Sequence, residues 1–162
     1  MDNGQRSIPE AALTGNAFVD AQNTIIKLVG AQGCQSVQQI RLGEMRASCT
    51  MLSLAGLNAA LQTAAAPADG AFPCHFLGAN SGQPSVRFAE CFFIGRDDHA
   101  QPLSEYLIRR GLAFAARAPN GAPLFPEYAA AEAEAAKAHV GIWSNAAFRH
   151  PYGERYRQNQ MN

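Results

Sequence analysis

The stretch PLSEYLIRRG, residues 102–111, marks both ends of a helix, and PEYAAAEAEAAKAHVG, residues 126–141, repeats the same plan. Each stretch opens with a proline, which is favoured in the first turn of a helix, and ends with a glycine, which is favoured just after the last turn. The second stretch is rich in alanine and glutamate, which have high helix propensity. A third helix is predicted over residues 50–65, where leucines recur at helical spacing.

Runs of β-forming residues precede and separate these helices, at residues 16–20, 24–29, 36–42, 72–77 and 85–94. The glycines of VGAQGCQS, residues 29–36, predict a hairpin loop between the second run and the third. Short strands with interleaved helices predict an α+β, mainly β fold, in which a five-stranded sheet closes into a small barrel beside three helices. The predicted domain covers residues 15–148, between a flexible arm at residues 1–14 and a polar tail at residues 149–162.

The composition describes a globular chain without a basic surplus. Of the 162 residues, 48% are hydrophobic and 16% are charged, which is typical of one folded domain. The thirteen basic and thirteen acidic residues cancel, which counts against a dedicated nucleic-acid binder. No apolar run reaches the length of a membrane span, and the polar N-terminal residues carry no recognisable secretory signal.

Four cysteines allow either two disulfides or four buried thiols, and no C-x-x-C spacing favours zinc. Cys74 and Cys91 fall on two strands joined by a turn-rich segment, so a cross-strand bridge is feasible. Cys34 in the predicted loop and Cys49 after the next strand are candidates for a second bridge. Two bridges would indicate an oxidising compartment, so a periplasmic or secreted location is expected, with the cytoplasm as the alternative.

Three segments resemble the staphylococcal-nuclease-like (thermonuclease) family. These are VRFAECFF (86–93), LSEYLIRRGLAFA (103–115) and EYAAAEAEAAKAHVGIWS (127–144). The resemblance runs from about Gly15 to Trp143. It implies an OB-fold, a five-stranded barrel with three helices, and a calcium-dependent phosphodiesterase chemistry.

The family's chemistry lies in three motifs, as the resemblance implies. An aspartate-glycine-aspartate-threonine turn gives one calcium ligand. A segment with the pattern arginine-leucine-x-glycine-isoleucine-aspartate-x-proline-glutamate gives an arginine, a second calcium ligand and a glutamate that orients water. A tyrosine-glycine-arginine gives a second arginine, and the two arginines neutralise the phosphodiester.

In this chain RLGEMRASC, residues 41–49, aligns with the second motif and keeps Arg41. It places Arg46 at the calcium aspartate and Cys49 at the glutamate. In the turn AQNT, residues 21–24, Asn23 replaces the other calcium aspartate, while SVR, residues 85–87, keeps Arg87. A guanidinium about 4 Å from a divalent cation costs on the order of 8 kcal/mol at an effective dielectric of about 20. Calcium is therefore expected to be lost, and no metal or other cofactor is expected.

The surviving arginines leave alternatives open. Arg41 and Arg87, with Arg46, are expected to converge on one barrel face as an anion-binding group, or else to form ion pairs with Glu44, Glu90 or the helices. Cys49 is a candidate nucleophile beside an arginine, but no histidine is placed to act as its base, so a disulfide or a buried thiol is favoured.

The predicted function is a catalytically impaired nuclease-fold protein that acts as a binding or scaffold domain for a protein partner. One alternative is an active phosphodiesterase with a rearranged site that hydrolyses DNA or RNA. Another is a weak binder of single-stranded nucleic acid or nucleotides through the arginines.

Overall fold

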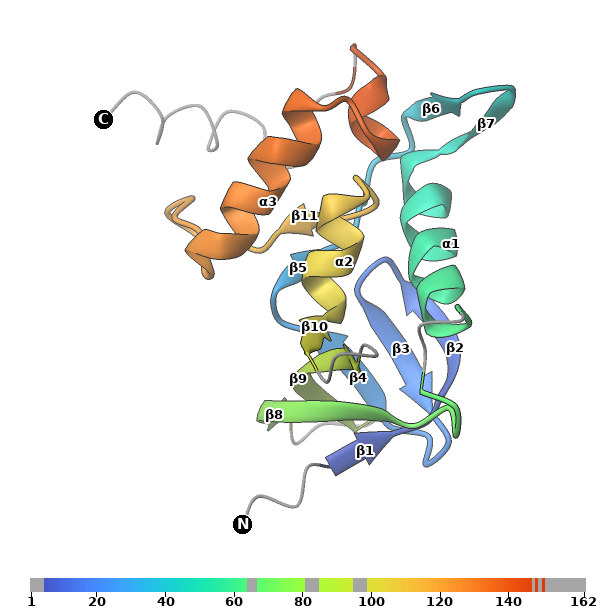
Figure 1. Ribbon diagram of the computed structural model, residues 1–162, viewed down its shortest axis with the longest axis vertical. Helices are drawn as coiled ribbons and strands as arrows, with labels where there is room; N and C mark the ends of the chain where they lie inside the picture. Colours follow the sequence, from blue (N-terminus) through green and yellow to red (C-terminus); the bar gives the residue numbers. More distant parts are fainter. Residues whose placement is uncertain are drawn as a thin grey trace.

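The computed structural model describes residues 5–63, 67–80, 85–94, 99–146, 148 and 150 (Figure 1). It shows an α+β fold that consists mainly of strands, with a curled sheet and three α-helices. The helices are α1 (Cys49–Leu61), α2 (Leu103–Arg109) and α3 (Pro126–Lys137), followed by a 3-10 turn, η1 (Gly141–Ser144). The strands are β1 (Gln5–Ser7), β2 (Pro9–Thr14), β3 (Ala17–Asp20), β4 (Ile25–Leu28), β5 (Ala31–Gln32), β6 (Gln39–Leu42), β7 (Met45–Ser48), β8 (Phe72–Asn80), β9 (Val86–Ile94), β10 (Ala100–Pro102) and β11 (Phe114–Ala115).

The main sheet has the order β1-β8-β9-β4-β3-β2, and β10 pairs with β9. Its pairs are antiparallel except β4 with β9, which run parallel. Only Ile8 separates β1 from β2, so one continuous stretch of chain forms both edges of this order. The sheet therefore curls round, because its two edge strands are covalently joined.

The prediction of a flexible arm over residues 1–14 is wrong for residues 5–14, and residues 1–4 lie outside the described part of the chain. Ser7 is buried and pairs with Phe72, while Ala12 pairs with Phe18. The sequences QRS and PEAALT lack the alternation of apolar and polar residues by which strands are recognised, because most side chains of β1 and β2 are exposed or half-buried and no apolar face is needed.

The predicted hairpin between residues 24–29 and 36–42 is also wrong. β4 pairs with β3 and β9, the intervening β5 pairs with β11, and β6 pairs with β7 in a hairpin outside the main sheet. Gly43 has φ of +58° and stands first in the two-residue turn of that hairpin, the position at which a type II′ turn takes glycine.

All three predicted helices are present, and Gly111 follows α2 as expected. α3 ends at Lys137, earlier than predicted: His139, with φ of +55°, follows its last turn, and Gly141 begins η1. α1 ends at Leu61, and residues 64–66 lie outside the described part. Gly111 and Gly141 have φ of +66° and +57°. A Cβ on Gly111 would come 2.2 Å from the Val140 carbonyl oxygen, and Ile142 N donates to Gly111 O at 2.9 Å. The end of α2 and the start of η1 are therefore packed together through these glycines.

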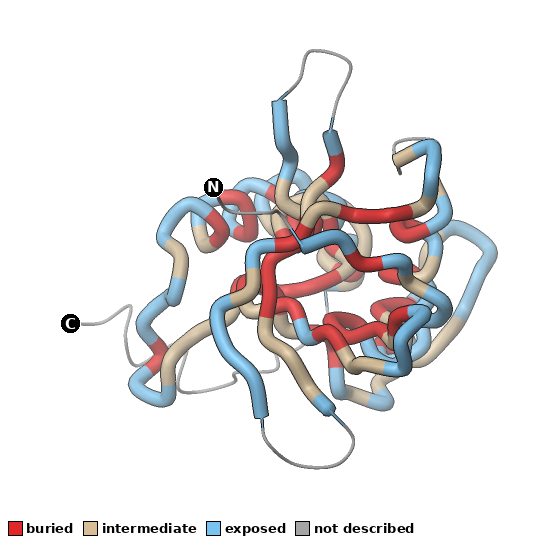
Figure 2. Tube along the Cα trace, turned by 90° about the horizontal axis from the view of Figure 1, so that it is seen from below, coloured by how far each residue is buried: buried red, intermediate tan, exposed pale blue. Residues whose placement is uncertain are grey.

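The core lies between the curled sheet and the helices, where the buried segments of Figure 2 gather. A larger apolar cluster joins the sheet, α1, α2 and α3 through side chains such as Phe18, Leu57 and Leu107. A smaller cluster joins the β6–β7 hairpin to the C-terminal segment through Ile40, Phe114 and Ile142. Within the described residues, none of the helices has the length and apolar character that crossing a membrane requires.

Candidate functional site

A cavity of about 230 Å³ opens at the turn between β2 and β3, where that turn meets the loop after β5 and the first turns of α1. Its lining residues come from four segments of the chain: Leu13, Thr14, Gly15, Asn16, Ala17, Lys27, Gln32, Gly33, Cys34, Gln35, Thr50 and Leu54. Because these segments are distant in sequence, the cavity exists only in the folded chain.

Two glycines and a serine hold these segments together. A Cβ on Gly15 would come 2.0 Å from Ser53 Oγ and 2.8 Å from the Cα of Gly33, so only glycine fits at this crossing. Ser53 Oγ accepts a hydrogen bond from Cys34 N at 3.0 Å and donates one to Leu112 O at 2.8 Å. The Cys34–Cys49 disulfide adds a covalent link between the loop and the start of α1.

Asn16 is the buried polar side chain of this cavity, and its amide is engaged in holding the turn. Its Nδ2 donates to Ala31 O at 2.9 Å, and its Oδ1 accepts from the Thr14 hydroxyl at 3.0 Å. The backbone carbonyl oxygen of Asn16 accepts a hydrogen bond from Leu28 N at 2.8 Å. Asn16 therefore fixes the position of the β2–β3 turn relative to β4 and β5.

The other polar side chains of the lining are the ammonium of Lys27, the amides of Gln32 and Gln35, and the hydroxyls of Thr14 and Thr50. Cys34 is oxidised in a disulfide, so among the described residues the lining carries no carboxylate, imidazole or thiol. A general base and a hard metal ion both need groups of those kinds, carboxylates above all for calcium. The residues present do not fit calcium, and they suit the binding of a neutral or anionic group by hydrogen bonding.

A second cavity, of about 280 Å³, lies on the β6–β7 hairpin and is lined by Gln39, Ile40, Arg41, Arg46 and Asn145. Arg41 and Arg46 are directly opposite each other in the hairpin register. Asn145, which follows η1, donates to Arg41 O at 3.0 Å and accepts from Arg41 N at 2.8 Å. This cavity brings two of the three predicted arginines together.

Arg87 does not join them, so the predicted convergence of three arginines on one face is wrong. Arg87 lies on β9 and its guanidinium stacks on the Phe76 ring, 3.7 Å from the ring centroid. Figure 1 places β9 towards one end of the long axis and the β6–β7 hairpin at the other. The separation follows from the extra hairpin, which carries Arg41 away from the main sheet.

The positions predicted as lost metal and base sites also lie apart. Asn23, with φ of +62°, stands in the turn between β3 and β4, at the other end of β3 from Gly15. That turn is closed by Asp20, whose Oδ1 accepts from Gln22 N and Thr24 N at 3.0 and 2.9 Å. Cys49 is buried in its disulfide at the start of α1, so it is not a free nucleophile.

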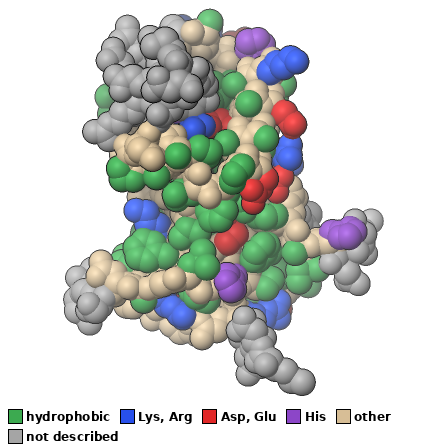
Figure 3. Space-filling view, turned by 90° about the vertical axis from the view of Figure 1, so that its left-hand side faces the viewer, with side chains coloured by type: hydrophobic (Ala, Val, Ile, Leu, Met, Phe, Trp, Pro, Cys, Tyr) green, Lys and Arg blue, Asp and Glu red, His purple; other side chains and the backbone are tan. Residues whose placement is uncertain are grey.

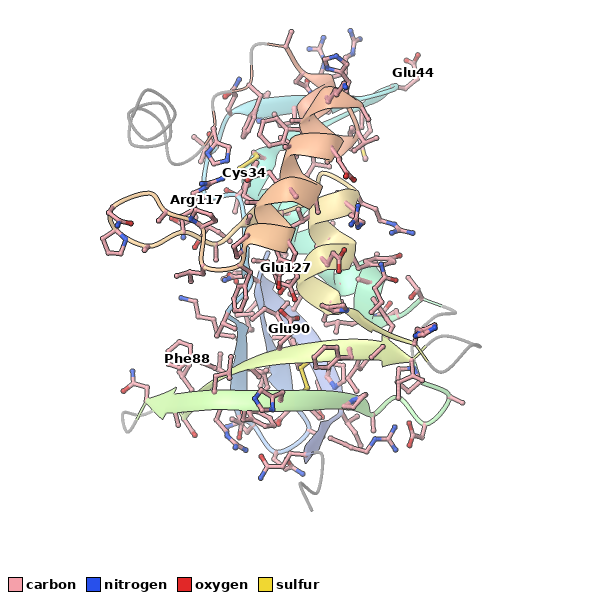
Figure 4. All side chains as sticks on the ribbon, turned by 60° about the vertical axis from the view of Figure 1, so that its left-hand side comes forward. Cys34, Glu44, Phe88, Glu90, Arg117 and Glu127 are labelled. Atoms are coloured by element: carbon pink, nitrogen blue, oxygen red, sulfur yellow. A yellow bond between two sulfur atoms is a disulfide. The ribbon has the colours of Figure 1, made fainter. Side chains whose placement is uncertain are left out.

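The acidic partners expected for the arginines are engaged elsewhere or point away. Glu44 stands at the tip of the β6–β7 hairpin and points out of the body (Figure 4). Glu90 points from β9 towards the helices, and Ser104 N donates to its Oε1 at 3.1 Å while the Tyr128 hydroxyl donates to its Oε2 at 3.3 Å. Burial raises the pKa of Glu90 against the opposing effect of these hydrogen bonds.

Both predicted disulfides are present: Cys34 with Cys49, and Cys74 with Cys91 across the β8–β9 pair. The described residues contain no free cysteine. Two disulfides in a chain of this size indicate an oxidising location.

Sequence reasoning missed the first cavity because its lining residues have no chemical signature. Asn16, Lys27, Gln32 and Gln35 are ordinary surface residue types, and only the glycines at 15 and 33 mark the crossing. No protein-family model matches this chain, and no curated protein matches it.

Proposed function

We propose that this chain is an OB-type barrel of the staphylococcal-nuclease-like kind that has lost its hydrolytic groups and acts as a binding domain. The strand arrangement supports the barrel. A circuit of five strands returns to its first member and consists of residues 5–14, β3, β4, β9 and β8, in that spatial order. It contains one parallel pair, β4 with β9, and α1 lies between β4 and β8 in the chain. Three helices accompany this circuit, as the family resemblance implies.

The geometry favours a different alignment of the family motifs from the one that RLGEMRASC predicts. Two motifs that share one metal must meet in space, and residues 21–24 do not lie with residues 41–49. The turn at residues 14–17 and the segment KLVGAQGCQ, residues 27–35, do line one cavity. KLVGAQGCQ has leucine and glycine at the second and fourth places of the longer motif, and Thr14–Ala17 has the glycine of the shorter one.

In this alignment the conclusion about chemistry is unchanged. Asn16 and Gln32 stand at the two calcium aspartates, Gln35 at the glutamate, and Lys27 at the first arginine. Each carboxylate is replaced by an amide of similar shape that has no charge. Loss of a general base costs about 10²- to 10⁴-fold in rate, and loss of the metal removes several kcal/mol more. The observation that carries the proposal is that the described residues lining the cavity include no carboxylate.

The surface supports a protein partner at an oxidising location, which we assign to the periplasm or the exterior of the cell. Figure 3 shows one face on which basic and acidic groups are interspersed and hydrophobic side chains gather between them, without a broad basic field. Exposed Leu13 lies in the cavity lining, and exposed Met51 follows Thr50 of that lining. Exposed apolar side chains at the rim of a cavity are typical of protein recognition.

The test compares the wild-type protein with the variant N16D/Q32D/Q35E, which restores three carboxylates. Both are incubated with single-stranded DNA and RNA, with and without calcium, and both are melted with and without calcium. We expect no cleavage and no calcium-dependent rise in Tm for the wild type, and a calcium-dependent rise in Tm for the variant. Wild-type cleavage that is lost in Lys27→Ala or Arg87→Ala would overturn the proposal in favour of a rearranged nuclease.

A further inference from the structure

We infer that the β6–β7 hairpin carries a second, separate binding site in which Arg41 and Arg46 hold the phosphate of a phosphate ester. The two residues are directly opposite in an antiparallel pair, so their side chains leave the hairpin on the same face. Both are exposed. This site is distinct from the cavity at the β2–β3 turn and lies on an element outside the main sheet.

The charge arrangement on this face is unfavourable without a ligand. Like charges directly opposite each other destabilise an antiparallel pair. Within the described residues, neither Arg41 nor Arg46 forms an ion pair, whereas Arg6, Arg109 and Arg117 each do. An anion between the two guanidinium groups would convert this repulsion into two charge-assisted interactions.

The hairpin is held firmly enough for its arginines to be positioned before a ligand arrives. On the opposite face, Ile40 is fully buried in the smaller apolar cluster, and Leu42 and Ala47 pack against that cluster. On the open edge of β6, the Asn145 amide makes two hydrogen bonds to the backbone of Arg41, as a neighbouring strand would. Asn145 is itself tied to η1, since its N and Nδ2 both donate to Ile142 O.

The chemistry of the site selects a dianion. Two guanidinium groups carry two positive charges, which a phosphate monoester matches with about −1.5 to −2, while a carboxylate supplies only one charge. Guanidinium forks also bind phosphate oxygens in pairs. The cavity of about 280 Å³ has room for a phosphate or diphosphate group, and Gln39 and Asn145 add polar atoms to its wall.

The test is a titration of the intact protein with inorganic pyrophosphate, with a nucleoside monophosphate and with a single-stranded oligonucleotide, followed by ¹H–¹⁵N shifts at low salt. We expect saturable shifts at the backbone and side chains of Arg41 and Arg46. R41A and R46A should each weaken binding about tenfold, as the loss of one charge-assisted interaction implies. R110A is the matched control, because Arg110 is exposed, stacks on Tyr106 and lies outside this cavity.

Three further outcomes decide the details. R41K and R46K keep the charge but not the fork, so they should bind more weakly than the wild type and more tightly than the alanine variants. N145A should weaken binding while leaving the charge unchanged. Pyrophosphate binding as tight as that of the nucleotide would identify the phosphate alone as the ligand. Tighter binding of the oligonucleotide, whose phosphodiesters carry one charge each, would contradict the selection of a dianion.

The inference is overturned if no saturable binding occurs at low salt, or if R110A weakens binding as much as R41A does. Neither result bears on the cleavage and calcium experiment at the other cavity, so the two proposals fail independently.

Discussion

At the scale of single residues, Glu90 shows how a buried carboxyl can serve the fold. Its Oε1 accepts from the backbone N of Ser104, in the first turn of α2, and from the backbone N of Cys91. Its Oε2 accepts from Tyr128 of α3. One side chain on β9 therefore fixes the start of one helix and contacts another, and burial raises the pKa both of this carboxyl and of the Tyr128 hydroxyl.

The raised pKa of Glu90 predicts a pH dependence of stability. Because the folded state favours the protonated form, the stability that Glu90 contributes is complete below its ordinary pKa of 4.5 and is lost as pH rises through the higher folded value. E90Q has no such titration. We expect the free energy of unfolding of the wild type to fall relative to that of E90Q as pH rises from 4 to 8, by about 1.4 kcal/mol for each pKa unit of the shift. Urea unfolding of both proteins across this range measures the difference, and parallel pH profiles would show that Glu90 ionises freely in the fold.

Gly15 is the residue on which the crossing of three chain segments depends. In G15A the new methyl would overlap Ser53 Oγ and the backbone of Gly33, so the β2–β3 turn must move. We expect a loss of about 1–3 kcal/mol in the free energy of unfolding. G78A is the matched control, since a Cβ there would meet only Phe88 Cδ2 at 3.9 Å. Chemical denaturation of both variants decides the matter, and equal midpoints would mean that the crossing is loosely packed.

At the scale of secondary-structure elements, the sequence could best predict features that depend on residues close together in the chain. Features that join distant segments were out of its reach. The end of α2 is marked by Gly111 and the start of α3 by Pro126, so both could be predicted from residues within each segment. The end of α3 could not, because His139 and not Gly141 takes the left-handed conformation after the helix. The pairing of β6 with β7 is also local, because only the turn Gly43–Glu44 joins them, and the prediction missed it by taking the glycines of residues 29–36 as the hairpin loop. The pairing of β4 with β9 joins distant segments and has no local signal. Likewise Arg41 and Arg46 stand out by charge in the sequence, whereas the amides at 16, 32 and 35 form a cavity only when four segments meet.

The loop at residues 33–38 is the element that depends most on a covalent link. It has no strand or helix of its own, and the Cys34–Cys49 disulfide ties it to α1. Cys74–Cys91, in contrast, joins strands that are already paired. C34A/C49A should lose about 3 kcal/mol of stability, as expected for a loop of this length. It should also show faster amide exchange at residues 33–38.

The matched control is C74A/C91A, whose bridge spans 17 residues against 15. We expect a similar loss of stability, but amide exchange in β8 and β9 close to that of the wild type under native conditions. If residues 33–38 stayed equally protected in C34A/C49A, the hydrogen bonds from Cys34 N to Ser53 Oγ and from Thr50 N to Ser36 O would be sufficient to hold the loop.

At the scale of the whole molecule, the fold depends on residues 5–14, which form the strands at both edges of the sheet, β1 and β2. β2 pairs with β3, and β1, one residue earlier, pairs with β8 through Gln5–Cys74, Arg6–Pro73 and Ser7–Phe72. The same closure places the β2–β3 turn over the loop after β5, which creates the cavity of the proposed function. The site and the stability of the curled sheet are therefore linked through residues 5–14.

A chain that begins at residue 8 should separate these roles, because it lacks β1 but keeps β2. Its β8 edge would be unpaired and the buried Phe72 would become accessible. We expect a loss of about 2–3 kcal/mol from the missing ladder hydrogen bonds, relative to a chain that begins at residue 5. Urea unfolding gives this difference, and amide exchange should accelerate first in β8.

An unpaired strand edge is also a template for association, so the shorter chain should form oligomers at high concentration in sedimentation experiments. If the two chains were equally stable and monomeric, β1 would contribute nothing to closure. The sheet would then act as an open one, and the cavity at the β2–β3 turn would have to be held by α1 and the disulfide alone.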